Sequence, residues 1–289
     1  MTMPNLFLVA APRTGSTQLA HWLASHPDVN LSLVKEPNFF AAHEFDPDYV
    51  TASHLNDIDP TRRVSRPTQF AVFRDPDRYA ALFDDMTTPW RMDASTSYLS
   101  CPEAPARIHT SCPGAKVILL TRDPFTRAIS HYKLAQRTGR TRARLGDEIA
   151  AELTGQLPLA ARYLLRPSQQ ECGVARFRAA FGDQSHHLTF EDMVDSPRLA
   201  LDQIARFLSI DRHGFDLTAK ARNSGAEPRF ARLNAALLRC GLKTQIRRAL
   251  PLWAKPYLRR LWFDETRNAF IHPNDIAALR TALESPCES

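Results

Sequence analysis

The feature that most constrains this chain is a pair of mainly apolar segments, each followed directly by a basic turn and then by a helical pattern. The first segment is residues 5–10, and the second is residues 115–121. Each is a short apolar run of the length expected for a buried strand. Buried strands that alternate with helices are typical of a parallel sheet with crossover connections. We therefore predict an α/β, three-layer fold with a central parallel sheet flanked by helices.

The rest of the pattern adds elements without indicating a second domain. Further elements are expected as strands at 29–34 and 187–190 and as helices at 77–83 and 199–208. Residues 41–91 are rich in Asp and Pro and otherwise predict an irregular excursion. From about residue 225 the pattern is helical and basic. We predict a single domain over residues 1–289 with a mainly helical, basic C-terminal part.

The charge of the chain points to anionic partners. The formal net charge is +6, which favours nucleic acid, an acidic membrane or a polyanionic small molecule. No nucleic-acid-binding module is apparent, so we expect no nucleic-acid partner. The N-terminus does not resemble a signal peptide, and no apolar stretch approaches the length of a transmembrane segment.

The cysteines bear on the compartment. There are 5 of them, scattered along the chain, and none belongs to a CxxC pair. This spacing predicts neither a zinc site nor a disulfide framework. We therefore expect a reducing, cytoplasmic location.

The turn after the first apolar segment has the composition of an anion site. Gly15 permits a close backbone approach, Arg13 brings a permanent positive charge, and Thr14, Ser16 and Thr17 bring hydroxyl groups. A strand-to-helix turn presents backbone N–H groups to an anion. The alternative is an ordinary turn in which the hydroxyl groups cap the helix. Unlike the loop of nucleoside triphosphatases, this one has no lysine after its glycine.

The second segment repeats the design. Arg122 ends the strand, Asp123 and Pro124 mark the turn, and Ser130 lies eight positions after Arg122 on the following helix. A strand-end arginine and a helix serine can bind one phosphate together. Two anion sites at neighbouring strand ends suit a ligand that is phosphorylated at two places.

In these two motifs the chain resembles the sulfotransferases that use 3'-phosphoadenosine-5'-phosphosulfate (PAPS). Residues 12–17 resemble that family's 5'-phosphosulfate loop, and residues 122–132 resemble its 3'-phosphate motif. Weaker similarities occur at 35–40, 93–98 and 190–193. The resemblance covers roughly residues 5–210 and implies a fold like that of P-loop nucleotide-binding proteins.

The resemblance also implies roles for single residues. Arg13, Thr14, Gly15, Ser16 and Thr17 would hold the 5'-phosphosulfate, and Arg122 and Ser130 the 3'-phosphate. Arg13 would also stabilise the leaving oxygen during in-line transfer of the sulfuryl group to an acceptor hydroxyl. The product would be adenosine 3',5'-bisphosphate. No metal is expected, because the scheme requires none and the sequence shows no metal-ligand cluster.

Glu36 is the candidate general base for the acceptor hydroxyl. It lies just before the aromatic pair at positions 39 and 40, as the base does in glycan-acting members of the family that this chain resembles. The alternative is a surface ion pair with Lys35, which itself is either a sulfuryl contact or a solvated lysine. A histidine is the base in another branch of the family, and the alternatives are His43, His54 and His109. His131 is expected to be structural.

The late basic loop at residues 220–229 resembles the segment that closes over the nucleotide in the family. Arg229 is the candidate for a further phosphate contact, with a plain basic loop as the alternative. The basic, apolar pattern after it favours an amphipathic helix on the protein's own core over a membrane or glycan surface.

The predicted function is therefore transfer of a sulfuryl group from PAPS to an acceptor hydroxyl, on a carbohydrate or a secondary metabolite. The alternative within the same architecture is a small-molecule or nucleoside kinase with a degenerate phosphate loop. A non-catalytic nucleic-acid or membrane-binding protein would leave both phosphate motifs unexplained.

Overall fold

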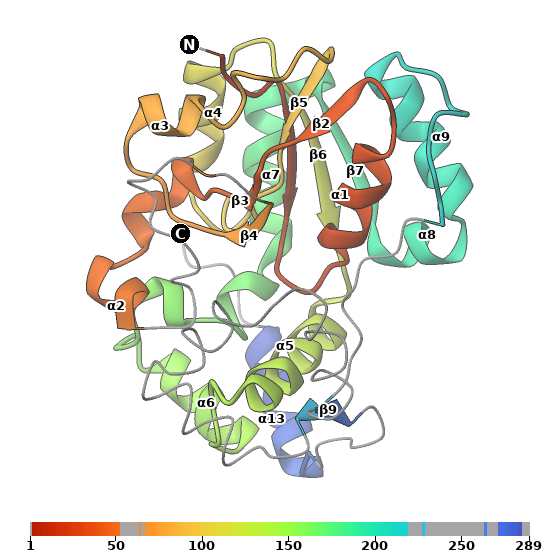
Figure 1. Ribbon diagram of the computed structural model, residues 1–289. Coiled ribbons are helices and arrows are strands. Elements are labelled where there is room, and N and C mark those ends of the chain that lie inside the picture. Colours follow the sequence, from red (N-terminus) through yellow and green to blue (C-terminus); the bar gives the residue numbers. More distant parts are fainter. Residues whose placement is uncertain are drawn as a thin grey trace.

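The predicted parallel sheet is present. The computed structural model describes residues 2–52, 64, 67–218, 227–228, 263–264 and 271–284. Five strands lie in the order β2-β5-β1-β6-β7, and every neighbouring pair is parallel (Figure 1). Their bounds are β1 Leu6–Ala10, β2 Val29–Leu31, β5 Trp90–Asp93, β6 Lys116–Thr121 and β7 Ser185–Thr189. The α/β fold class is confirmed.

Shorter strands and the helices complete the described residues. The remaining strands are β3 Val34–Glu36 with β4 Thr68–Phe70, which are parallel, and β8 Glu227–Pro228 with β9 Phe263–Asp264, which are antiparallel. The α-helices are α1 Ser16–Ala24, α2 Pro47–Ala52, α3 Pro76–Ala80, α4 Ala104–Ser111, α5 Pro124–Thr138, α6 Leu145–Leu153, α7 Gln170–Phe181, α8 Phe190–Asp195, α9 Pro197–Leu208 and α13 Pro273–Leu283. The 3₁₀ turns are η1 Phe39–Glu44, η2 Leu159–Ala161, η3 Arg166–Ser168 and η4 Gly182–Gln184.

The two faces of the sheet bury different helices because side chains alternate along each strand. On β1, Leu6 and Leu8 join the core formed with α1 and α9, whereas Phe7 and Val9 join the core formed with α4 and α7. Strand β6 divides its side chains in the same way. All residues of β1 are fully buried, which explains its continuous apolar run.

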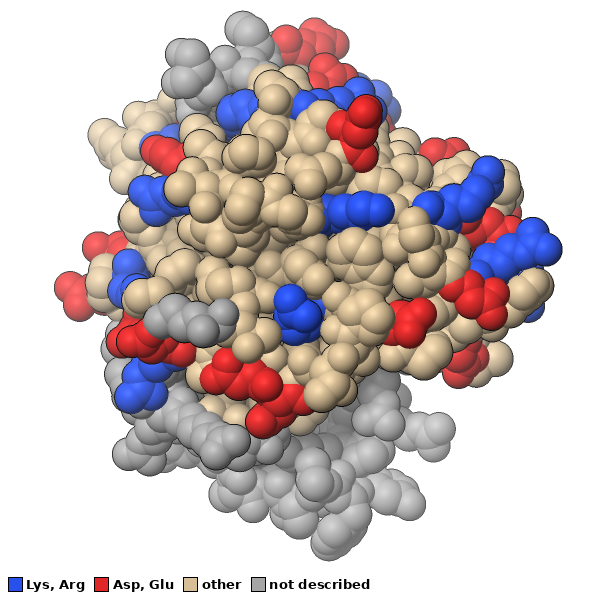
Figure 2. All heavy atoms as spheres, turned by 90° about the horizontal axis from the view of Figure 1, so that it is seen from above, with Lys and Arg blue, Asp and Glu red and all other residues tan. Residues whose placement is uncertain are grey.

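A third apolar cluster lies beyond the carboxyl ends of the strands. There α5 and α6 pack with α13, and Leu145, Ile149 and Leu279 are buried between them (Figure 1). On the opposite side, seen from above in Figure 2, basic and acidic side chains of the described residues are interspersed. The arginines of the two predicted motifs lie at the carboxyl ends of β1 and β6, away from that face.

Two expectations from the sequence are corrected. The strand predicted over 29–34 is divided into β2 and β3, which belong to different sheets. Strand β5 lies at the end of a region predicted to be irregular. It was not predicted because Arg91 and Asp93 interrupt its apolar pattern. Cys172 is disulfide-bonded, whereas Cys101 and Cys112 are buried free thiols. The cysteine spacing predicted no disulfide framework and did not indicate this single bond.

The described part of the chain has no helix that is both long enough and apolar enough to cross a bilayer. The basic, helical part predicted from about residue 225 lies mostly outside the described residues, as does His54.

Candidate active site

The loop between β1 and α1 has an unusual backbone conformation. Arg13 has φ +75° and Gly15 has φ +83°, both in the left-handed region. A non-glycine residue there carries strain of about 1–3 kcal/mol, which is typical of functional loops. Such turns make concave nests of backbone N–H groups that bind anions. Helix α1 begins directly afterwards, at Ser16, and adds the positive end of its dipole.

The two predicted arginine motifs meet at one place. The Arg13 Nε–H donates to Ser130 Oγ at 3.1 Å, and Arg122 Nη1 donates to the carbonyl of Arg13 at 3.0 Å. Burial, together with the positive charges of Arg137 and Arg122, lowers the pKa of Arg13 to about 10. Arg13 is therefore protonated at neutral pH and lies in a positive field. The loop after β1 and the turn after β6 form a single cationic site.

Arg122 is held in a defined position. Gln170 bonds its backbone on both sides, accepting from its N–H at 3.0 Å and donating to its carbonyl at 2.7 Å. The guanidinium lies over the ring of Phe190, 4.3 Å from the centroid. Its Nε is buried and has no hydrogen-bond partner among the described residues. Because buried donors are normally paired, an orphaned guanidinium N–H fits an anionic ligand.

Phe190 and Met193, in the segment 190–193 that weakly resembles the family, also lie against Gly15. A Cβ added to Gly15 would lie 2.8 Å from Met193 Cε and 2.9 Å from Phe190 Cδ2. The start of α8 thus packs against Gly15, the glycine of the loop between β1 and α1. Phe190 contacts Arg122 on one side and Gly15 on the other, which links the two halves of the cationic site.

The hydroxyl groups of the loop divide into two kinds. Thr14 is fully buried, and its hydroxyl donates to the carbonyl of Ala11 at 2.8 Å. A ligand contact at Thr14 is thereby restricted to its backbone N–H. Ser16 and Thr17 line a cleft of about 610 Å³ that Arg13 and Glu36 also line.

Glu36 ends β3 inside this cleft and is 9% exposed. Lys35 Nζ donates to its Oε1 at 3.1 Å and Gln69 Nε2 donates to the same oxygen at 2.8 Å, while Thr96 donates to Oε2 at 2.6 Å. Lys35 is 5% exposed and lies 3.5 Å from Ser16 Oγ. The Lys35–Glu36 pair exists, but it is buried, so the surface-pair alternative is wrong.

A buried polar network fixes the segment around Glu36. Asn38, at φ +54°, donates to the carbonyl of Glu36 at 2.7 Å, and its backbone N–H donates to Ser95. Ser95 in turn donates to Asp93, which also accepts from Tyr79 and Tyr98. Burial raises the pKa of Asp93 to about 6, and these hydrogen bonds oppose the rise. Asp93, Ser95 and Tyr98 of this network belong to the segment 93–98 that weakly resembles the family.

The histidine alternatives lie in other places. His43 is exposed and contacts Glu103, and His109 packs its ring against Phe181. Neither lines the cleft. His131, predicted to be structural, does line it, and its Nδ1 lies 3.4 Å from Arg127 Nη1.

Arg127 was not predicted from the sequence. It is completely buried, and it donates to the carbonyls of Pro12, Tyr163 and Leu164 and to the hydroxyl of Ser168. Burial lowers its pKa to about 9, and the charge of Glu152 opposes that shift. The contact with Pro12 ties α5 directly to the loop after β1.

Glu152, also buried, completes this arrangement from the other side. Its carboxylate accepts from the backbone N–H groups of Tyr163, Leu164 and Leu165 at 2.5, 2.6 and 2.7 Å. Arg127 donates to the carbonyls of Tyr163 and Leu164 in the same segment. The two peptide groups of this segment therefore lie between the guanidinium of Arg127 and the carboxylate of Glu152. The segment that forms one wall of the cleft is therefore fixed by charge-assisted hydrogen bonds.

The cleft is lined by several arginines. The sequence did not indicate this cluster because its members lie in separate segments of the chain. The arginines that line the cleft besides Arg13 are Arg137, Arg140, Arg162 and Arg166. Arg166 forms a two-bond ion pair with Glu44, at 3.0 and 2.5 Å. Arg229 lies outside the described residues.

Comparison with known proteins gives a consistent picture. Residues 4–214 match the model of the family described as "Sulfotransferase family". Human heparan sulfate glucosamine 3-O-sulfotransferase 6 is 30% identical over 129 residues, covering 45% of this chain and 30% of that protein. Mouse carbohydrate sulfotransferase 15 is 24% identical over 190 residues, covering 59% and 33%. The matched regions thus span about a third of these relatives.

One solved structure supports the fold over nearly the whole chain. A sulfotransferase from Alicyclobacillus acidocaldarius aligns with a TM-score of 0.66 at 22% identity, covering 97% of this chain and 100% of that one. At this identity the likeness concerns the fold.

Gly15→Ala tests the contact between the loop and α8. The added methyl group meets Phe190 and Met193 at a left-handed φ, so we expect a loss of about 2 kcal/mol or more in the free energy of unfolding. Urea denaturation measures it. Gly114→Ala is the matched control, because nothing lies within 4 Å of its added Cβ. Equal stabilities of the two variants would contradict the packing role of Gly15.

Proposed function

The chain belongs to the sulfotransferase family, and we propose that it transfers a sulfuryl group from PAPS to a hydroxyl group of an acceptor. The observation that carries this proposal is the convergence of Arg13, Ser130 and Arg122 in one cationic site. A donor with phosphate groups at two ends of one nucleoside matches two anion-binding motifs that touch each other.

The donor contacts follow from this arrangement. The 5'-phosphosulfate binds the nest between β1 and α1 with Arg13, Ser16 and Thr17. The 3'-phosphate binds Arg122, whose orphaned Nε–H supplies a donor, together with Ser130. Because Ser130 bonds Arg13 in this structure, donor binding exchanges that bond for contacts with phosphate oxygens. Arg229 stays a prediction for a further phosphate contact.

The chemistry is an in-line substitution at sulfur. The acceptor oxygen forms a new S–O bond while the S–O bond to the 5'-phosphate breaks, and the phosphate oxygen takes the electron pair. Arg13 stabilises the charge that develops there, an effect worth ~3 kcal/mol for a single preorganised donor. Glu36 accepts the proton of the acceptor hydroxyl, held in place by Gln69 and Thr96. Lys35, next to Ser16, faces the sulfuryl oxygens.

The acceptor is, by our proposal, an anionic carbohydrate. Beyond Glu36 the cleft is lined by Arg140, Arg162 and Arg166, which favour carboxylate or sulfate groups on the molecule that carries the hydroxyl. The relatives named above are carbohydrate sulfotransferases by their names. A hydroxyl of a secondary metabolite is the alternative acceptor.

The kinase alternative is less favoured. In this loop Ser16 follows Gly15, so the lysine that follows the glycine in the loop of nucleoside triphosphatases is missing. The cytoplasmic location expected from the cysteine spacing stays a prediction.

Arg122→Ala tests the donor site. Loss of a charged hydrogen-bond donor should weaken binding of adenosine 3',5'-bisphosphate about 10- to 100-fold, as measured by calorimetry. Arg198→Ala, at an exposed position on α9, is the control and should bind normally. Unchanged affinity in Arg122→Ala, or a preference of the wild-type protein for ATP with magnesium, would refute the assignment.

Glu36→Gln tests the base. Thr96 can rotate its hydroxyl to accept from the new amide, so the fold should be kept while turnover falls at least ~100-fold. Binding of adenosine 3',5'-bisphosphate should be normal. Glu171→Gln, in the first turn of α7 and outside the cleft, is the control. Near-normal transfer by Glu36→Gln would shift the role of the base to His131.

An acceptor screen with labelled PAPS tests the charge of the substrate. Matched saccharides with and without a carboxylate or sulfate group should differ in kcat/KM by ~10-fold or more in favour of the charged member. Equal turnover of the neutral member would argue against the arginines that line the cleft as an acceptor site.

A further inference from the structure

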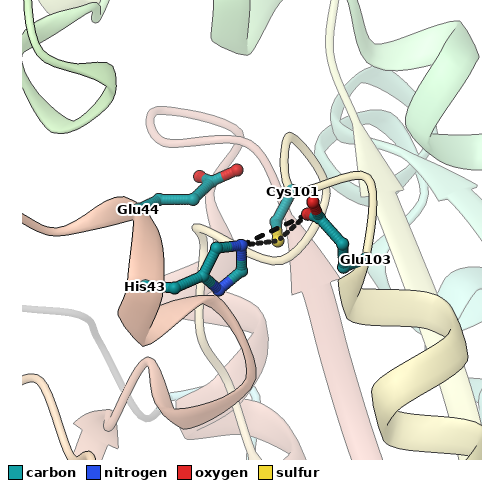
Figure 3. Close-up of side chains that lie close together, drawn as sticks. All are labelled: His43, Glu44, Cys101 and Glu103. Atoms are coloured by element: carbon teal, nitrogen blue, oxygen red, sulfur yellow. Dashed lines mark hydrogen bonds and ion pairs between the residues drawn. The ribbon is translucent and has the colours of Figure 1, made fainter.

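Four side chains with metal-binding groups meet outside the proposed donor site. His43 and Glu44 lie at the end of η1, and Cys101 and Glu103 lie just before α4. One ligand atom from each residue lies within 4.8 Å of the others. Figure 3 shows the imidazole of His43, the thiol of Cys101 and the carboxylate of Glu103 joined by close contacts, with the Glu44 carboxylate near them.

Three distances in this cluster are close to the edges of a zinc tetrahedron. His43 Nε2 lies 3.2 Å from Glu103 Oε2 and 3.9 Å from Cys101 Sγ, and the Cys101 Sγ to Glu103 Oε2 distance is 3.4 Å. Zinc bonds of roughly 2.0 Å to nitrogen and oxygen and 2.3 Å to sulfur give tetrahedral edges of about 3.3–3.8 Å. Three of the groups therefore need little movement to bind one ion.

We propose that His43, Cys101 and Glu103 bind a zinc ion, with Glu44 as the fourth ligand. The combination of thiol, imidazole and carboxylate favours zinc over magnesium and calcium, which take oxygen ligands. On binding, the thiol of Cys101 gives up its proton to solvent. Its sulfur, one nitrogen and two carboxylate oxygens then complete a closed, four-coordinate site, which is the form of structural zinc sites.

The surrounding charges support the ion. A thiolate and two carboxylates bring three negative charges, so the zinc site has a net charge of −1. Arg166, which already bonds both oxygens of Glu44, balances that charge. A cavity of about 260 Å³ that His43, Glu44 and Glu103 line adjoins the cluster.

Arg107 supplies a specific prediction about the imidazole. Its Nη1 donates to His43 Nδ1 at 3.0 Å, which places the ring proton on Nε2. Zinc bound at Nε2 requires that proton on Nδ1, so the exposed Arg107 side chain must move away. Arg107 therefore opposes zinc, and its removal should strengthen binding.

The site adjoins the cleft without sharing its donor residues. Glu44, Ser100, Leu159 and Arg166 line both the small cavity and the cleft. A zinc ion on Glu44 weakens the hold of that carboxylate on Arg166, which faces the proposed acceptor. Zinc binding is thereby connected to the arginines that line the cleft through Arg166. Arg13 and Arg122 are not part of the zinc site.

Cobalt and zinc titrations of the full-length protein test the proposal. Cobalt chloride should give one bound ion per chain and a thiolate-to-cobalt charge-transfer band in the near ultraviolet, which zinc chloride should abolish by displacement. Cys101→Ser should lose the band, and Cys112→Ser, at the other buried free thiol, should keep it.

Calorimetry with zinc chloride gives a second measurement at exposed positions, where substitution leaves the fold intact. His43→Ala should weaken zinc binding ~10-fold or more, Arg107→Ala should tighten it, and His109→Ala should leave it unchanged. Absence of the band in the wild-type protein, its persistence in Cys101→Ser, or equal affinities of His43→Ala and His109→Ala would overturn the zinc site.

Discussion

The buried guanidinium of Arg127 is the interaction on which the geometry of the site depends. It is completely enclosed, and its hydrogen bonds join three parts of the chain: α5, the loop at Pro12 and the segment at 163–164. A buried charge without compensation costs several kcal/mol, so the loss of any one of these hydrogen-bond acceptors would destabilise the fold. Glu152 opposes the charge through the peptide groups of the same segment. The cationic site and the wall of the cleft are thereby held as one unit.

The arginines of the proposed donor site are held in defined positions in this structure. Arg13 is already directed by Ser130, and Arg122 by Gln170 and the ring of Phe190. For a donor bound as proposed, Arg122 needs little additional ordering, which is the general advantage of preorganisation, whereas Arg13 and Ser130 exchange their mutual bond for ligand contacts. The same arrangement explains why Arg13 tolerates a left-handed backbone conformation: its side chain and its carbonyl are both used in contacts between the two motifs.

The sequence predicted the parts of the site that are local. Strands β1 and β6 have continuous apolar runs, and the turns after them place Arg13 and Arg122 at one edge of a parallel sheet. It did not predict Arg127, because its acceptors come from a segment about 36 residues away in the chain. It also missed the burial of Glu36, whose partners belong to distant segments. Strand β5 was missed since charged residues interrupt its pattern.

The strand register has a consequence for folding. Leu6 of β1 pairs with Met92 on one side and with Lys116 on the other. Strand β1 precedes both neighbours in the chain, and the partners of Leu6 lie 86 positions later in β5 and 110 positions later in β6. Such long-range parallel pairing slows folding, and β1 is entirely apolar in the meantime. The nascent chain therefore has a period of exposure to aggregation that ends only when β6 leaves the ribosome.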